Sequence, residues 1–288
     1  MVWSAPTYPQ PVSQWSEVAQ GVFQRRYQPL DVSVCVVVCG EGLLVIDTRS
    51  NGREADELRT DLLALSPLPV LAVVNTHGHY DHCFGNQRFG PASDLTVPIF
   101  GHARVPAQLE TYEQPELSAW IAAGVEPVAD WRAVVLTPPT ELVGSFRALT
   151  LGGRAVELAH LGRGHTDNDL VVHVPDAATW LVGDLVEESG PPAFGCDSFP
   201  LDWGCTLAAL VGQLEPGAVL VPGHGAPVDR DFAASQRDSI AAVATLVRAA
   251  HSARLSPAEA RDAHASEWPF PAETVESAIR AGYAQLAT

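Results

Sequence analysis

Three histidines and an aspartate lie within six consecutive residues, in the run His77-Gly78-His79-Tyr80-Asp81-His82. Side chains two residues apart on extended backbone point to the same side, so His77 and His79 can share one metal ion. Asp81 and His82 follow where the chain turns, and they are aimed at a neighbouring point. Three nitrogens and one oxygen favour zinc or a similar borderline cation over calcium or magnesium, which prefer mostly oxygen ligands. A polar turn that happens to be rich in histidine is the weaker interpretation, because the whole chain holds only 10 histidines.

The metal-binding motif follows an apolar run at residues 69–74. This run is short, continuous and rich in β-branched residues, which indicates a strand buried on both faces rather than an amphipathic helix. Asn75 and Thr76 end the strand. The motif is therefore expected in the crevice beyond the carboxyl end of a buried strand, where open α/β sheets bind their ligands.

Further candidate ligands follow later strands. His165 comes after a predicted strand at 155–160, Asp184 after one at 179–182, and His224 after one at 219–221. An aspartate at the end of an apolar strand needs a partner, and a cation supplies one. Glycines beside His165 and His224 let the backbone pass close to a bound ion. Asp47 closes an earlier strand and is predicted to orient a metal-bound histidine rather than to occupy a surface turn.

The remaining pattern predicts an ordinary globular protein with one domain over 1–288, a core at about 20–230 and C-terminal helices at 231–288. Residues 1–20 are predicted to form a Pro-rich arm, and 103–123 an interrupted helix. That helix and the Pro-rich stretch at 137–140 contain few residues that are expected to be buried, so they are expected to form a variable cover over the site. His102 is expected to be a surface or packing histidine rather than a ligand, and His160 is expected to be structural. The other predicted elements are strands at 22–26, 32–38, 43–47, 97–100 and 170–174 and helices at 53–65, 206–214, 233–250 and 272–286.

Composition excludes several functions. The net charge is −17, and all 17 basic residues are arginine. Such a surface repels polyanions, so no nucleic-acid partner is expected. The absence of lysine removes Schiff-base and Walker-type chemistry. No apolar stretch is long enough to span a membrane, no secretory signal is visible, and the five cysteines are expected to be reduced, so a cytoplasmic location without membrane contact is predicted. The oligomeric state stays open.

Together, the HxHxDH run at 77–82, Gly164-His165-Thr166, Gly183-Asp184 and Gly223-His224-Gly225 resemble the metallo-β-lactamase superfamily of metal-dependent hydrolases. The motifs occur in the matching order over roughly residues 20 to 230. The resemblance implies an α/β (α+β) fold of four αβ/βα layers, in which two mixed β-sheets pack face to face with helices outside and the metals at one edge.

The resemblance also implies a division of ligands: His77, His79 and His165 on one metal, Asp81, His82 and His224 on a second, and Asp184 bridging both. Two Zn²⁺ ions per chain are expected, with iron or manganese as alternatives. The implied reaction is attack of a metal-bound hydroxide on an ester, thioester, lactone or amide carbonyl of a small molecule. Asp81 is expected to be catalytic, orienting the hydroxide or passing its proton on.

Departures from named subfamilies narrow the substrate by exclusion. Several β-lactamases of the superfamily carry a lysine three residues after the position of Asp184, whereas this chain has Glu187 followed by Glu188. If these two glutamates line the pocket, neutral or cationic substrates are expected to be preferred over carboxylates. The alternative function is that of a mononuclear non-haem iron sulfur dioxygenase on the same fold. A metal-free scaffold ranks last because no ligand type is missing.

Overall fold

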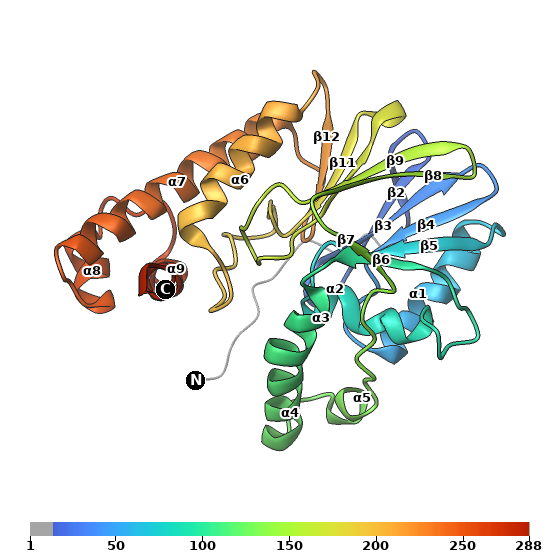
Figure 1. Cartoon of the computed structure of the whole chain (residues 1–288), viewed down its shortest axis with the longest axis horizontal. Helices are drawn as coiled ribbons and strands as arrows, with labels where there is room; N and C mark the ends of the chain where they lie inside the picture. The colour runs from blue at the N-terminus through green and yellow to red at the C-terminus, as the bar shows by residue number, and fades with distance from the viewer. Residues whose placement is uncertain (1–13, 288) are drawn as a thin grey trace.

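The computed structural model describes residues 14–287, which form two β-sheets packed face to face and covered by helices on their outer sides (Figure 1). One sheet has seven strands in the order β1-β2-β3-β4-β5-β6-β7, and the other has five in the order β12-β11-β10-β9-β8. The four-layer sandwich predicted from the sequence is therefore confirmed.

The first sheet contains antiparallel strands β1 to β4 and parallel strands β4 to β7. Its strands are β1 (Ser16–Ala19), β2 (Val22–Tyr27), β3 (Val32–Cys39), β4 (Gly42–Ile46), β5 (Val70–Val74), β6 (Ile99–His102) and β7 (Glu141–Val143). The second sheet is antiparallel except for the parallel pair β11 and β12. Its strands are β8 (Phe146–Leu151), β9 (Arg154–Ala159), β10 (Val171–Val174), β11 (Thr179–Gly183) and β12 (Val219–Pro222).

Helices cover each sheet from outside. The longer ones are α1 (Gly52–Leu65), α4 (Gln114–Ala123), α6 (Pro200–Gln213), α7 (Arg230–Ser252) and α9 (Ala272–Ala287). The shorter ones are α2 (Tyr80–Cys83), α3 (Val105–Gln108), α5 (Val128–Arg132) and α8 (Pro257–Ala263), with single turns η1 (Phe84–Arg88), η2 (Leu109–Glu113) and η3 (Pro175–Ala177). No helix within residues 14–287 combines the length and apolar character needed to cross a membrane.

The buried core has three main layers, each explained by which faces of the strands are apolar. Val37, Leu44 and Val74 of the first sheet meet Leu158 and Leu181 of the second between the sheets. The alternate side chains of β3 and β4, among them Val34, Val36 and Val45, pack against Leu58 and Leu62 of α1. Residues of α6, α7 and α9 cover the outer face of β11 and β12. Strands β3, β4, β5 and β11 are thus buried on both faces, as their continuous apolar sequences predict.

Most predicted elements are present, with several corrections. Residues 16–19 form strand β1 rather than part of an arm, and residues 1–13 of that predicted arm lie outside the described part. Helix α6 begins at Pro200, six residues before the predicted start, because proline fits the first turn of a helix. The strand predicted at 97–100 is β6, which lies at Ile99–His102 instead.

The prediction that the segment at 103–123 buries little is wrong. Val105, Leu109 and Leu117 are buried, and together with Trp131 they form an apolar cluster on Cys83 and Phe84. This cluster fixes α3, η2 and α4 against the turn that carries the HxHxDH run. The segment is therefore a packed wall beside the motif rather than a loosely held cover.

Candidate metal centre

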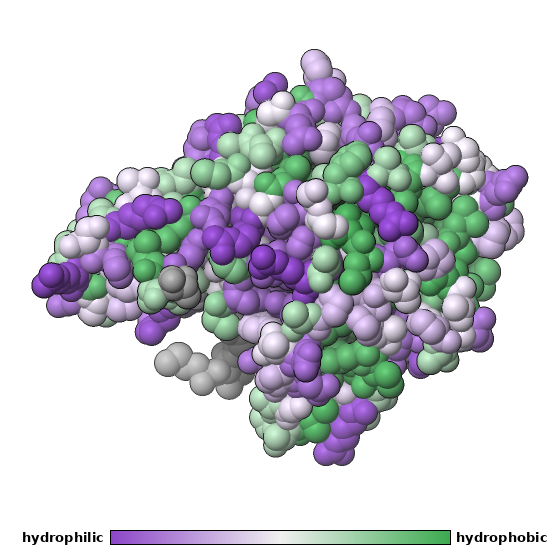
Figure 2. Space-filling view, in the orientation of Figure 1, coloured by the Kyte–Doolittle hydropathy of each residue, from purple (hydrophilic) through white to green (hydrophobic). Residues whose placement is uncertain are grey.

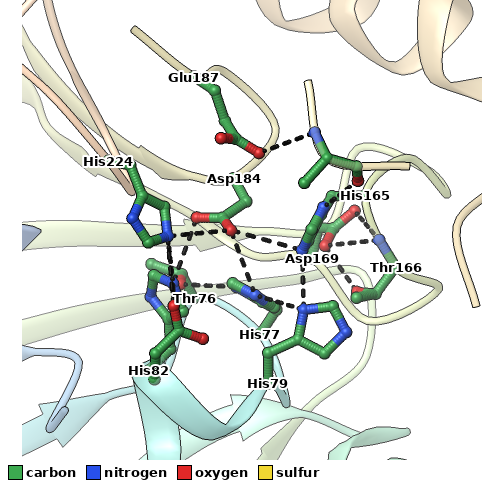
Figure 3. A network of polar contacts seen from close by, with 12 residues as sticks. Thr76, His77, His79, His82, His165, Thr166, Asp169, Asp184, Glu187 and His224 are labelled. Atoms are coloured by element: carbon green, nitrogen blue, oxygen red, sulfur yellow. Dashed lines mark hydrogen bonds and ion pairs between the residues drawn. The ribbon is translucent and has the colours of Figure 1, made fainter. Parts of the chain in front are cut away.

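All seven predicted ligands come together at one edge of the sandwich. Figure 3 labels all of them except Asp81. His77, His79, Asp81 and His82 lie on the turn after β5 and in α2. His165 lies in the loop after β9, Asp184 directly after β11, and His224 two positions after the last residue of β12. The expectation that each follows a strand is confirmed, because strand ends from both sheets meet at this edge.

The first group of three nitrogens is compact. The distance from His77 Nε2 to His79 Nδ1 is 3.1 Å, and the distance from His165 Nε2 to His79 Nδ1 is 2.8 Å. Neutral imidazole nitrogens this close must share either a proton or a cation. In a tetrahedral site with Zn–N bonds of about 2.0 to 2.1 Å, neighbouring nitrogens lie about 3.3 Å apart. The three nitrogens therefore fit one small divalent ion.

The second group lies beside the first. His82 Nε2 is 3.3 Å from His224 Nε2, and Asp81 Oδ2 is 3.4 Å from His224 Nε2. Asp184 stands between the groups: its Oδ2 is 3.4 Å from His165 Nε2 and 3.4 Å from His224 Nε2. The buried Oδ1 of Asp184 makes no hydrogen bond among the described residues, and its ion-pair partner is His82 Nε2 at 3.3 Å. A buried carboxylate oxygen without a donor is costly unless a cation neutralises it, so this position fits a ligand shared by two ions.

Every imidazole of the cluster has a polar partner on its outer nitrogen. The pairs, with their distances, are His82 Nδ1 and Asp47 Oδ2 (2.9 Å), His79 Nε2 and Asp197 Oδ2 (2.8 Å), His77 Nδ1 and Thr76 Oγ1 (3.1 Å), His165 Nδ1 and the Ala193 carbonyl (3.1 Å), and His224 Nδ1 and the Leu30 carbonyl (2.8 Å). An acceptor on the outer nitrogen takes the ring proton, which leaves the inward nitrogen free to coordinate a metal.

Asp47 has the orienting position that the sequence predicts. Its carboxylate accepts hydrogen bonds from the backbone N–H and the hydroxyl of Thr76, both at 2.8 Å, in addition to its contact with His82. Its backbone has a φ of 67°, a left-handed conformation that aspartate and asparagine tolerate better than most residues. Close approach also explains Gly223, where a Cβ atom would lie 1.8 Å from Asp184 Oδ1.

Burial and charge set the protonation of the cluster. Burial lowers the pKa of His77 and takes the pKa of His165 to about 4, so both rings are neutral at pH 7. Burial also lowers the pKa of His79 and of His82, but the carboxylates beside them outweigh it and raise both to about 9. Burial alone would raise the pKa of Asp81. The neighbouring His82 and His224 outweigh this effect and lower the pKa of Asp81 to about 2. The cluster thus holds protons that a divalent cation would displace on binding.

A pocket of about 520 Å³ opens onto the cluster. Its other lining residues include the aromatic Tyr80, Tyr112 and Trp120 and the acidic Glu113, Glu116, Glu187 and Asp197. Figure 2 views this face and shows hydrophilic side chains gathered near its centre, between the C-terminal helices and α4. None of the described lining residues is arginine. The pocket therefore offers apolar and negatively charged contacts to a ligand.

The two glutamates singled out in the sequence differ in position. Glu187 is buried and lines the pocket, where its Oε1 accepts a hydrogen bond of 3.1 Å from the Ala193 backbone. Burial raises the pKa of Glu187 to about 8. Glu188 is exposed, and its carboxylate accepts a hydrogen bond from the backbone of Ala226. Of the two glutamates, only Glu187 lines the pocket. The predicted preference for neutral or cationic substrates over carboxylates therefore depends on Glu187.

Two residues beside the cluster, Asp197 and Glu113, are not predicted from the sequence. Asp197 lies in the loop before α6, 118 positions from the histidine it contacts, and it also accepts a hydrogen bond of 2.7 Å from Gln108. Glu113 lies in η2, is 1% exposed, and has an Oε1 with no hydrogen-bond partner among the described residues. No local pattern marks these residues, because only the tertiary fold brings them to the cluster. His102 and His160 stack on one another with ring centroids 4.3 Å apart, consistent with a packing role for His102 and a structural role for His160.

A sequence model of the metallo-beta-lactamase superfamily matches residues 28–224. The chain therefore belongs to the metallo-β-lactamase superfamily. The related β-lactamases and alkylsulfatases are hydrolases of that superfamily.

The relatives and solved structures are distant. A type 2 metallo-β-lactamase of Bacillus cereus is 22% identical and covers 75% of each chain. A linear primary-alkylsulfatase of Pseudomonas sp. is 23% identical over 65% of this chain but only 40% of the relative. Among solved structures, a metallo-β-lactamase from Pontibacter korlensis has a TM-score of 0.60 at 21% identity, covering 78% of this chain and 98% of that one. A sec-alkylsulfatase from Pseudomonas sp. has a TM-score of 0.77 at 17% identity, covering 94% of this chain and 50% of that one. The chain thus spans half or less of the alkylsulfatases, and these structures establish the shared fold alone.

Proposed function

We propose that this protein holds two zinc ions at the cluster and hydrolyses an ester, thioester, lactone or amide of a small molecule. The observation that supports the proposal is the convergence of seven ligand side chains, in which each imidazole has its outer nitrogen paired. A fortuitous group of buried histidines would not be expected to have every ring oriented toward a common centre.

The ligands divide into two sets in this proposal. His77, His79 and His165 would hold one ion, Asp81, His82 and His224 the other, and Asp184 would contact both. When bound, two such ions supply hydroxide at neutral pH and Lewis acidity for the oxygen that gains charge in the reaction. Manganese or iron could occupy the same nitrogen and oxygen ligands.

The protein's own side chains would orient the reacting groups. The carboxylate of Asp81 lines the pocket at the cluster, where it can accept the proton of an attacking water and hand it to the leaving group. Asp47 and Asp197 would fix the rings of His82 and His79 and so keep the inward nitrogens aimed at the cluster. The wall formed by η2 and α4 would hold the substrate and limit the access of water.

The pocket wall favours uncharged or cationic substrates. A β-lactam carboxylate or an alkyl sulfate would enter a pocket whose described lining includes no arginine and several carboxylates. Repulsion between like charges in a partly desolvated pocket opposes such binding. Hydrolysis of β-lactams or of alkyl sulfates, the activities for which the relatives are named, therefore ranks lower for this chain.

The test is hydrolysis of a panel of neutral esters, thioesters and lactones, together with a β-lactam and an alkyl sulfate. The wild-type protein is expected to hydrolyse at least one of the neutral compounds, and His77→Ala to lose at least 100-fold in rate, the order of a missing metal ligand. His251→Ala, an exposed histidine on α7, serves as the matched control and should retain full activity. Equal activity of wild type and His77→Ala would refute the proposal.

A further inference from the structure

One wall of the pocket is built from a single helical stretch. Tyr112 and Glu113 end the turn η2, and Glu116 and Trp120 lie in α4, which continues it directly. The four residues line the pocket, and their spacing of three, four and seven positions places them on one helical face. The ring of Tyr80 packs edge-on to that of Trp120, with centroids 5.0 Å apart. Two carboxyl groups and three aromatic rings thus stand side by side.

Glu113 lacks the partner that a buried carboxyl group requires. It is 1% exposed, it lines the pocket, and its Oε1 has no hydrogen-bond partner among the described residues. Buried carboxyl groups are normally paired or hydrogen-bonded, because desolvation without compensation is costly. Neighbouring Trp131 contributes its ring to the same aromatic group, 5.4 Å from Trp120. A ligand in the pocket could supply the missing positive charge.

We propose that Glu113, Glu116, Tyr80, Tyr112 and Trp120 form a subsite for the cationic group of the substrate, an ammonium or a quaternary ammonium. Aromatic faces attract such cations, and the exposed carboxyl group of Glu116 adds charge complementarity. Burial raises the pKa of Glu113 to about 8, and a cation bound beside it would favour its ionised form. The subsite begins beside the metal cluster, since the ring of Tyr112 lies 5.8 Å from that of His79. The substrate would therefore carry its positive charge a few bonds from the carbonyl carbon that is attacked. This inference rests on the proposed hydrolase function and names its substrate class.

The test compares two esters of the same shape. Butyrylcholine and 3,3-dimethylbutyl butyrate differ in one atom, a positively charged nitrogen in place of a carbon. The wild-type metal-loaded protein is expected to favour the cationic ester by about tenfold or more in kcat/KM, the range of a desolvated cation on aromatic rings. Glu113→Gln and Glu116→Gln should each reduce this ratio. A ratio of one or less in the wild type would overturn the proposal.

Glu110→Gln is the matched control. Glu110 is an exposed residue of η2 that does not line the pocket, and its substitution removes the same charge from the same turn. The ratio should stay at its wild-type value. If Glu110→Gln lowered the ratio of kcat/KM values for the cationic and neutral esters as much as Glu116→Gln does, the effect would come from net charge, and the subsite would be contradicted.

Binding without turnover separates this inference from the function on which it rests. Calorimetric titration of the wild-type protein with choline and with the neutral 3,3-dimethyl-1-butanol needs no hydrolysis. Choline is expected to bind at least about tenfold more tightly, and Glu113→Gln and Trp120→Leu to remove the difference. Choline binding without hydrolysis of any ester would support the subsite and refute the hydrolase. Hydrolysis of the neutral ester with equal binding of both alcohols would refute the subsite alone.

Discussion

Substitution of Asp47 by asparagine changes the charge beside His82 while keeping size and backbone. Asparagine accepts the same left-handed φ of 67°, and its Oδ1 can still accept the hydrogen bond from the Thr76 backbone. Its amide nitrogen would instead face His82 Nδ1, now 2.9 Å from a carboxylate oxygen. An amide N–H donates a hydrogen bond, so His82 Nδ1 must become the acceptor and the ring proton must move to Nε2. Nε2 is the nitrogen that faces the cluster.

The expected loss of zinc affinity follows from the loss of the lone pair on His82 Nε2. Substitution of partners that orient metal-bound histidines typically costs 10- to 100-fold in metal affinity. At about 1.4 kcal/mol for each factor of ten, this is about 1.4 to 2.8 kcal/mol. The effect should fall on one of two bound ions, because Asp47 contacts His82 and none of the other clustered imidazoles among the described residues.

The assay is competitive titration of the metal-free protein with zinc against a chromophoric chelator. The Asp47→Asn variant is expected to bind one zinc ion with the wild-type affinity. It is expected to bind the second zinc ion about 10- to 100-fold more weakly than the wild type does. Asp61→Asn is the control, since Asp61 is a partly buried carboxylate that accepts a hydrogen bond from Tyr27 and contacts none of the cluster. Equal zinc affinity at both equivalents in Asp47→Asn and wild type would refute the reasoning.

Three further outcomes are expected. Asp197→Asn should weaken the other zinc equivalent by 10- to 100-fold, because Asp197 fixes His79 at 2.8 Å, and chelator titration checks it. When free metal is present at about 100 times its Kd, removal of the bound metal should lower the free energy of unfolding by about 2.7 kcal/mol. An unchanged Tm after chelation would contradict this expectation. Trp203→Ala should lower the free energy of unfolding in urea by about 3 to 5 kcal/mol. The reason is that Trp203 is fully buried against His165 and donates a hydrogen bond of 3.1 Å to the Leu185 carbonyl. A loss below about 1 kcal/mol would count against that packing.

Local patterns in the sequence predict the strands and their ends well. The run at 70–74 is a strand buried at its carboxyl end, and the capping box at Ser256 and Glu259 opens α8 as those residue types predict. The position of Asp47 could also be predicted, because a carboxylate that closes a buried strand needs a polar partner. These features depend on residues that are neighbours in the chain or on one strand face.

Features that depend on distant contacts could not be predicted. Asp197 lies in an irregular loop, and nothing in its neighbours shows that this loop crosses to His79. The helical wall was underestimated because Pro106 and Pro115 interrupt its pattern, yet both prolines occupy first-turn positions of α3 and α4. The unpartnered carboxyl of Glu113 becomes visible only when its surroundings are known.

The most direct test of the central claim is elemental analysis of the full-length protein purified without chelator. The dinuclear hydrolase predicts two zinc ions per chain, falling to one or fewer in His77→Ala and staying at two in His251→Ala. One iron atom per chain, with oxygen consumed in the presence of a glutathione persulfide, would contradict the claim and establish the oxygenase alternative in its place.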